Sequence, residues 1–188
     1  MERMVGDLFP LWSQVTVLFS LLLGAILGGV AAGSLSLEVR LELVKALQDF
    51  FGAPSWPGPT AIFWRSFWIH GLAWLLIWLG SLSTFGFLLI PAVLLFCGFL
   101  WGFASSFLLL EGGLAGLAVA ALTLWPSQFL LLFLWWAGGA KALYGASVKR
   151  PLPGRDWIPA LILLAAASLL DAYWSPAALH WILGMVRR

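Results

Sequence analysis

Long runs without a charged residue constrain this chain more than any other feature. Residues 8–37 (30 residues), 66–110 (45) and 112–140 (29) contain no Asp, Glu, Lys or Arg, and shorter charge-free runs cover residues 157–170 and 172–186. One membrane crossing needs about 20 apolar residues at a rise of ~1.5 Å each. The 45-residue run therefore has room for two crossings, with the break expected near the glycines and serines of residues 80–86.

The composition leads to the same class of protein. Of the 188 residues, 62% are hydrophobic and 10% are charged, whereas a soluble domain has about 25% charged residues. The chain is therefore predicted to be a single integral membrane domain over residues 1–188, with the lipid bilayer as its first partner. Its basic residues form no long run, so we expect no nucleic-acid partner. The single cysteine, Cys97, excludes an intrachain disulfide framework and a cysteine metal cage.

We expect an all-α, polytopic helical bundle of about five spans. They are predicted over residues 12–33, 64–83, 87–110, 127–146 and 157–172.

The short apolar segment 112–124 precedes Trp125-Pro126-Ser127-Gln128, where Pro126 lacks a backbone donor. A Pro-broken or re-entrant segment is predicted here. The freed carbonyls need partners, which Ser127 and Gln128 can supply. A broken helix can also mark a transport site, but the absence of charge near Pro126 favours a static break.

An amphipathic helix is predicted outside the spans, over residues 37–51. Its polar face holds Glu38, Glu42, Lys45 and Asp49, and its apolar face holds Leu37, Leu41, Val44, Leu47 and Phe51. Arg40 is the exception within the apolar arc. Such a helix lies at the membrane interface, or docks on the bundle or on a partner.

The basic residues predict an orientation. Lys149, Arg150 and Arg155 crowd the short loop before the last span, and short basic loops tend to face the cytoplasm. The amino terminus is then inside, and the amphipathic segment and the chain end are outside.

Small residues recur at helical spacing in two of the spans. Gly24 and Gly28, with Gly29 beside them, lie in the first, and Gly98 and Gly102 lie in the third. In lipid, small residues let helix backbones approach closely. Packing within one bundle is the favoured interpretation, and a partner surface, including a homo-oligomer contact, is the alternative.

Asp171 is the one aspartate expected within a span. A helix from Trp157 rises roughly 21 Å by that point, of a hydrocarbon core ~30 Å thick, which leaves Asp171 toward the far interface. Ser175 and Pro176 favour a new helix start there. We therefore interpret "DAYWSP" as a helix end and a corner, followed by an interfacial helix over residues 176–186. A polar bond from Asp171 into the bundle is the remaining role, with Gln128 as the candidate partner.

No constellation of residues predicts catalysis. His70 and His180 each stand alone in the sequence, and neither H-E-x-x-H nor G-x-S-x-G occurs. We expect no catalytic, cofactor-binding or metal-ligating residue, no cofactor, and a protein that is not an enzyme.

At four stretches the chain resembles the stage II sporulation protein M family. The small-rich first span runs into "GSLSLEVRLELVKALQDFFG", "IPAVLLFCGFLWGF" is similar to the family's third span, "LWPSQFLLL" to its Leu-Pro-Gln-Asn break, and "SLLDAYWSP" to its Glu-Ala-Phe-x-Ser-Pro corner. The four occur in the family's order over most of the chain. The chain departs from the pattern at Ser127-Gln128, where the family often has Gln-Asn, and at Asp171, which replaces the usual Glu.

The resemblance implies a multi-pass protein of the bacterial cell membrane. It implies a scaffold at the septal or engulfing membrane of a sporulating cell, which anchors stage II sporulation proteins D and P, the proteins that degrade peptidoglycan. The alternative function is a membrane subunit of a transporter or permease, based on the break at Pro126. A transported polar substrate would use Gln128, Glu111 and Asp171, the few polar groups that the spans offer.

Overall fold

The computed structural model describes residues 11–52, 57–149 and 154–179, and this part of the chain is almost entirely helical, with no strand. Five helices are long and apolar enough to cross a membrane: α1 (Leu11–Gly33), α3 (Pro59–Leu82), α4 (Gly86–Thr123), α5 (Trp125–Ser147) and the helix Trp157–Leu179, which begins as α6 (Trp157–Leu169). The prediction of an all-α polytopic bundle is confirmed.

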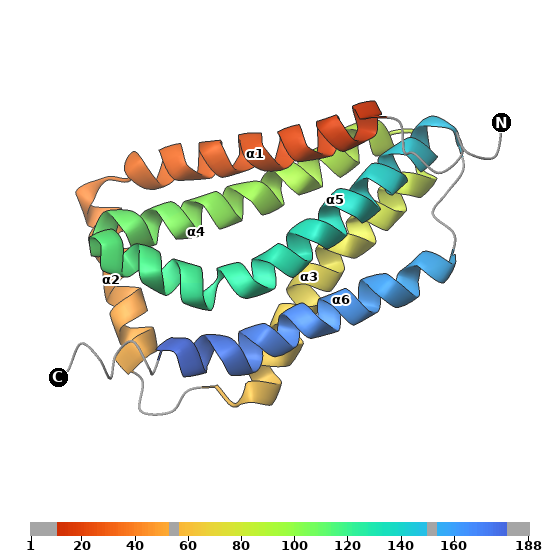
Figure 1. The fold of residues 1–188 in the computed structure, drawn as a ribbon. Helices are drawn as coiled ribbons and strands as arrows, with labels where there is room; N and C mark the ends of the chain where they lie inside the picture. The colour runs from red at the N-terminus through yellow and green to blue at the C-terminus, as the bar shows by residue number, and fades with distance from the viewer. Residues whose placement is uncertain (1–10, 53–56, 150–153, 180–188) are drawn as a thin grey trace.

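The spans run alongside one another, and the remaining helix crosses one end of them. α1 lies along α4, while α3, α5 and α6 form the rest of the bundle (Figure 1). The short helix α2 (Leu37–Gly52) crosses the end where α1 finishes and α3 begins (Figure 1). The turn between α3 and α4, and the start of α6, lie at the opposite end. We refer to these as the α2 end and the loop end of the bundle.

α4 contains a complete reversal of the chain. Gly113 has φ 56° and ψ −137°, a conformation that a residue with a side chain rarely adopts. A Cβ placed on Gly116 would lie 1.8 Å from the carbonyl oxygen of Leu108, so the returning limb, residues 114–123, touches the backbone of the limb it leaves. The returning limb then leads into α5 (Figure 1).

The break at Pro126 is a joint within one crossing. α4 ends at Thr123, α5 begins at Trp125, and α5 continues toward the loop end of the bundle (Figure 1). Of the two forms expected, the structure has the Pro-broken helix, not the re-entrant hairpin.

The corner predicted at "DAYWSP" is wrong. Residues 157–179 form one helix, in which Leu170–Trp174 make a π turn and the Ser175 N–H bonds to the Leu170 carbonyl, five residues back. A proline ring clashes with the carbonyl of the preceding turn, and the wide π turn directly before Pro176 accommodates it without ending the helix. Ser175 and Pro176 therefore lie inside a helix, and most of the interfacial helix expected over 176–186 lies outside the described residues.

The small-residue stripes join α1 to α4. A Cβ on Gly24 would lie 2.0 Å from the Leu95 carbonyl oxygen, and one on Gly28 would lie 2.1 Å from that of Phe99. In return, a Cβ on Gly98 would lie 2.2 Å from the Leu21 carbonyl oxygen, and one on Gly102 would lie 2.1 Å from that of Ala25. Gly29 faces the hydroxyl of Ser106. The stripes therefore serve packing within the bundle, and Gly24 and Gly28 are buried and closed to a partner.

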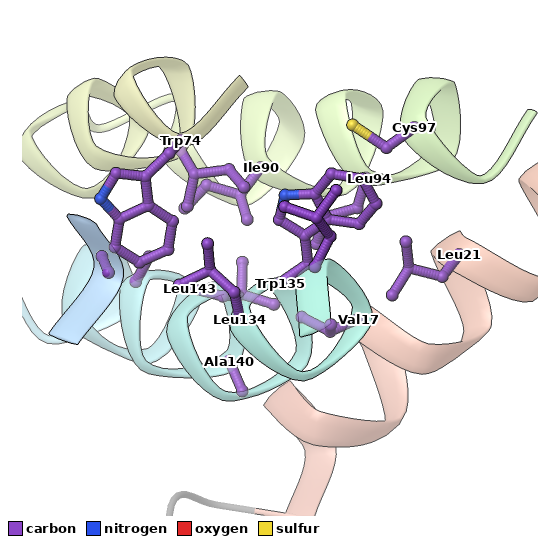
Figure 2. Packing of buried hydrophobic residues seen from close by; sticks show 14 of the residues in the cluster. Val17, Leu21, Trp74, Ile90, Leu94, Cys97, Leu134, Trp135, Ala140 and Leu143 are labelled. Carbon is purple, nitrogen blue, oxygen red and sulfur yellow. The ribbon is translucent and has the colours of Figure 1, made fainter. Parts of the chain in front are cut away.

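A hydrophobic core fills the middle of the bundle. Val17 of α1, Leu94 of α4 and Leu143 of α5 are almost fully buried there, and Figure 2 shows them with Trp74 of α3 and Trp135 of α5. Cys97 is part of this core, as a small packing residue.

Candidate functional site: a polar cluster and a helix joint

Three polar residues from two helices, α3 and α5, surround the carboxylate of Asp171. The Ser66 hydroxyl of α3 donates a hydrogen bond to Asp171 Oδ2 over 2.5 Å. His70 Nε2, one turn further along α3, lies 3.8 Å from the same oxygen. Ser127 of α5, which is buried, also lies close to the carboxylate, although its hydroxyl donates to the Leu124 carbonyl. Asp171 itself lies in the π turn, so the cluster connects α3, α5 and the last span.

This cluster corrects two expectations. His70 is not isolated, because it faces Asp171, and the partner of Asp171 is Ser66 rather than Gln128. Ser66 and His70 are four residues apart, so they share one face of α3. This spacing is the feature of the sequence that could have predicted that the two side chains act together. Nothing in the sequence alone showed that this face meets the last span.

An aspartate inside a membrane is costly, by about 2.5–3.5 kcal/mol at a helix centre. Hydroxyl donors and an imidazole reduce that cost by supplying hydrogen bonds to the charge. The contact between His70 and Asp171 is an ion pair only when the imidazole is protonated. The cluster can therefore stabilise the packing of α3 against the last span, and it can also hold or pass a proton.

The joint at Pro126 has its own polar partners. Pro126 has no N–H to give to the carbonyl of Leu122, four residues back. Two backbone bonds cross the break, from Leu124 N–H to Ala120 and from Gln128 N–H to Leu124, and neither uses the carbonyls of Leu122 or Thr123.

Both freed carbonyls are satisfied by the last span. Trp174 Nε1 donates to the Leu122 oxygen over 2.7 Å, and the Ser175 hydroxyl donates to the Thr123 oxygen over 2.6 Å. The "WPSQ" and "DAYWSP" stretches thus form one structure. Ser127 donates to the Leu124 carbonyl, which already accepts the Gln128 N–H, so it does not supply the freed carbonyls as expected. The bonds from Trp174 and Ser175 were missed because those residues are 52 positions away.

Two cavities lie on either side of the polar cluster. The α2-end cavity, of about 660 Å³, lies among α2, α3, both limbs of α4 and the last span, and Asp171 is part of its wall. The α3–α4 cavity, of about 520 Å³, has His70, Gln128 and Cys97 in its wall. Ala104 and Leu124 line both. The contact between His70 and Asp171 therefore lies between two mainly apolar spaces.

The polar face of α2 is exposed, as the amphipathic pattern predicts. Glu42 and Asp49 are exposed, and Arg40 forms an ion pair with Glu111, near the reversal in α4. This pairing explains the one charged residue in the apolar arc. Leu37 and Leu41 remain 69% and 59% exposed, so the bundle covers only part of that arc.

No group of three or more metal-ligating side chains occurs in the described part of the chain. Comparisons with protein-family models, with curated proteins and with solved structures found no match.

Proposed function

We propose that the chain is a non-enzymatic membrane scaffold, similar in role to stage II sporulation protein M. In this proposal it sits in the septal or engulfing membrane of a sporulating cell and anchors the peptidoglycan-degrading stage II sporulation proteins D and P. The orientation is the predicted one, with the α2 end outside, where peptidoglycan lies.

One observation carries the proposal: the four stretches of the resemblance also supply many of the bundle's internal contacts. The glycines of the first span pack on Gly98 and Gly102 of "IPAVLLFCGFLWGF". The carbonyls freed by Pro126 bond to Trp174 and Ser175 of "SLLDAYWSP". A bundle fixed in this way is suited to hold partners in place, and α2 offers them an exposed charged face.

Capture of the partner proteins tests the proposal. The chain, carrying an affinity tag, is expressed in an endospore former that lacks its own protein M, and membranes from sporulating cells are solubilised. Co-purification of proteins D and P is the expected result. Their absence at normal bait levels contradicts the scaffold role.

Charge reversal on α2 tests whether the partner proteins bind to this helix. Glu42→Lys with Asp49→Lys changes two exposed side chains and should leave insertion intact but weaken capture. Lys149→Glu, at the loop end, is the matched control. Equal capture by both variants removes α2 from the partner surface.

A transporter or permease subunit is the second candidate. The observation in its favour is the His70–Asp171 contact between two cavities, because ionisable residues inside membranes often lie on substrate or proton paths. Stoichiometric co-purification of an ATP-hydrolysing subunit, in place of wall-degrading proteins, would favour this candidate.

A further inference from the structure

The α2-end cavity combines an apolar interior with one cationic residue. Its walls include Phe103 and Phe107 of α4, together with Leu43 and Leu47 of α2. Arg65 of α3 lines the same cavity and is exposed. None of the three ion pairs in the described part of the chain includes Arg65. A positive charge without a carboxylate partner thus borders a space that favours hydrocarbon.

The position of Arg65 along α3 matches the depth of lipid headgroups. Arg65 is six residues past the start of α3 at Pro59, which places it roughly 9 Å into the helix. Trp64 and Trp68 on either side of it are 52% and 69% exposed, and exposed tryptophans gather at the membrane–water interface.

The acidic group in the same cavity does not neutralise Arg65. Asp171 lines the cavity but is bonded to Ser66 and faces His70, and Ser175 is bonded to the Thr123 carbonyl. Among the described residues that line the cavity, Arg65 therefore remains the group that can receive an anion. An arginine can bind two phosphate oxygens at once, which makes it a good phosphate ligand.

We propose that the α2-end cavity binds one anionic phospholipid, with an acyl chain among Phe103, Phe107 and Leu43 and with the phosphate on Arg65. The volume of about 660 Å³ falls within the range of small-molecule sites. The lipid would come from the leaflet at the α2 end. Because α2 forms one wall, the bound lipid also touches the helix that carries the proposed partner face. This site does not depend on the scaffold function, and it goes beyond it.

Photo-crosslinking in reconstituted membranes tests the site. The full chain is placed in vesicles containing a trace of phosphatidylglycerol with a diazirine at mid-chain, or of phosphatidylcholine with the same group, and crosslinked peptides are mapped by mass spectrometry. We expect the anionic probe to label residues 103–108 about fivefold more than the neutral probe, since one arginine near a membrane surface favours an anionic lipid by about that factor.

Five variants, in two sets, separate specific binding from bulk lipid. Arg65→Gln should lower labelling by the anionic probe about fivefold, while Arg65→Lys should keep most of the preference and Lys149→Gln, at the loop end, should keep all of it. Val119→Phe places a ring into the cavity wall and should reduce labelling by both probes. Val30→Phe, at a site 65% exposed, is its control.

Circular dichroism confirms that each variant is folded before labelling is compared. Equal labelling of residues 103–108 by the two probes, unchanged by Arg65→Gln, would show that bulk lipid occupies the cavity and would overturn the proposal. Labelling confined to the outer surface of the helices would overturn it as well.

Discussion

The hydrogen bond from the last span to the joint at Pro126 leads to a prediction about the stability of the fold. In the native chain, Trp174 Nε1 supplies the hydrogen bond to Leu122 that Pro126 cannot make. Trp174→Phe keeps the ring and removes the donor, so the Leu122 carbonyl loses its partner. The bond lies at the exposed surface of the bundle, where lipid offers no replacement partner. An unsatisfied polar group costs about 1–3 kcal/mol, while hydrogen bonds between membrane helices average about 0.6 kcal/mol with a maximum near 1.7. We expect Trp174→Phe to lower the free energy of unfolding by about 1–1.5 kcal/mol.

A second substitution makes the prediction specific to the joint. Pro126→Ala restores an N–H four residues after Leu122, so the helix can straighten and satisfy that carbonyl by itself. Trp174→Phe should then cost only a few tenths of a kcal/mol in the Pro126→Ala background. The expected coupling energy in the double-mutant cycle is about 1 kcal/mol.

The measurement is equilibrium unfolding in mixed micelles, followed by circular dichroism. Trp12→Phe is the matched control, because Trp12 is 47% exposed and Trp174 is 48% exposed, yet Trp12 lies far from the break. Ser168→Ala is the second control, because it also removes a hydrogen-bond donor, but one that bonds to a carbonyl of its own helix and not to the joint. Additive effects of Pro126→Ala and Trp174→Phe, within experimental error, would refute the argument that Trp174 replaces the missing backbone donor.

Three further predictions concern packing, α2 and orientation. Gly98→Ala should destabilise the bundle by about 1–3 kcal/mol, because its Cβ would lie 2.2 Å from the Leu21 carbonyl oxygen. Gly71→Ala has no atom near its Cβ and should stabilise the bundle by about 0.5–1 kcal/mol. Similar melting temperatures for the two variants would contradict this prediction. Arg40→Glu should expose α2 to trypsin at Lys45, and adding Glu111→Arg should restore protection; no rescue would mean that the ion pair does not hold α2. In a Cys97→Ala background, an impermeant maleimide should label Ser34→Cys in intact cells and Gly154→Cys only after lysis, and the reverse pattern would invert the orientation.

Much of the fold could be predicted because membrane spans are encoded locally. A charge-free run of sufficient length must become a helix, since no water is present to satisfy its backbone. The glycine spacing likewise predicts a close helix contact, and the structure supplies the partner, α4. The reversal at Gly113 was harder to place, because one glycine among several in "EGGLAG" adopts the required backbone conformation.

The polar cluster could not be assembled from the sequence. Asp171 was interpreted as a helix end because Ser175 and Pro176 are typical of a helix start. These preferences depend only on the local sequence of residues 171–176. In the structure, the Ser175 hydroxyl that would cap a new helix instead donates to the Thr123 carbonyl, so the tertiary partner outweighs the local preference. A pairing across 105 residues, such as Ser66 with Asp171, has no local signal.

The same pairings bear on the choice between a scaffold and a transporter. A passage from the α2-end cavity to the α3–α4 cavity has to move His70 away from Asp171, or to move Ala104 and Leu124, which line both spaces. Leu124 lies in the joint whose carbonyls are fixed by Trp174 and Ser175. Opening the passage at the joint would leave these two carbonyls without partners in a medium that supplies none, and opening it at His70 would separate the imidazole from the Asp171 carboxylate. A static bundle keeps all of these bonds, and this is the physical reason why we favour a scaffold with a lipid-filled cavity over a transport path.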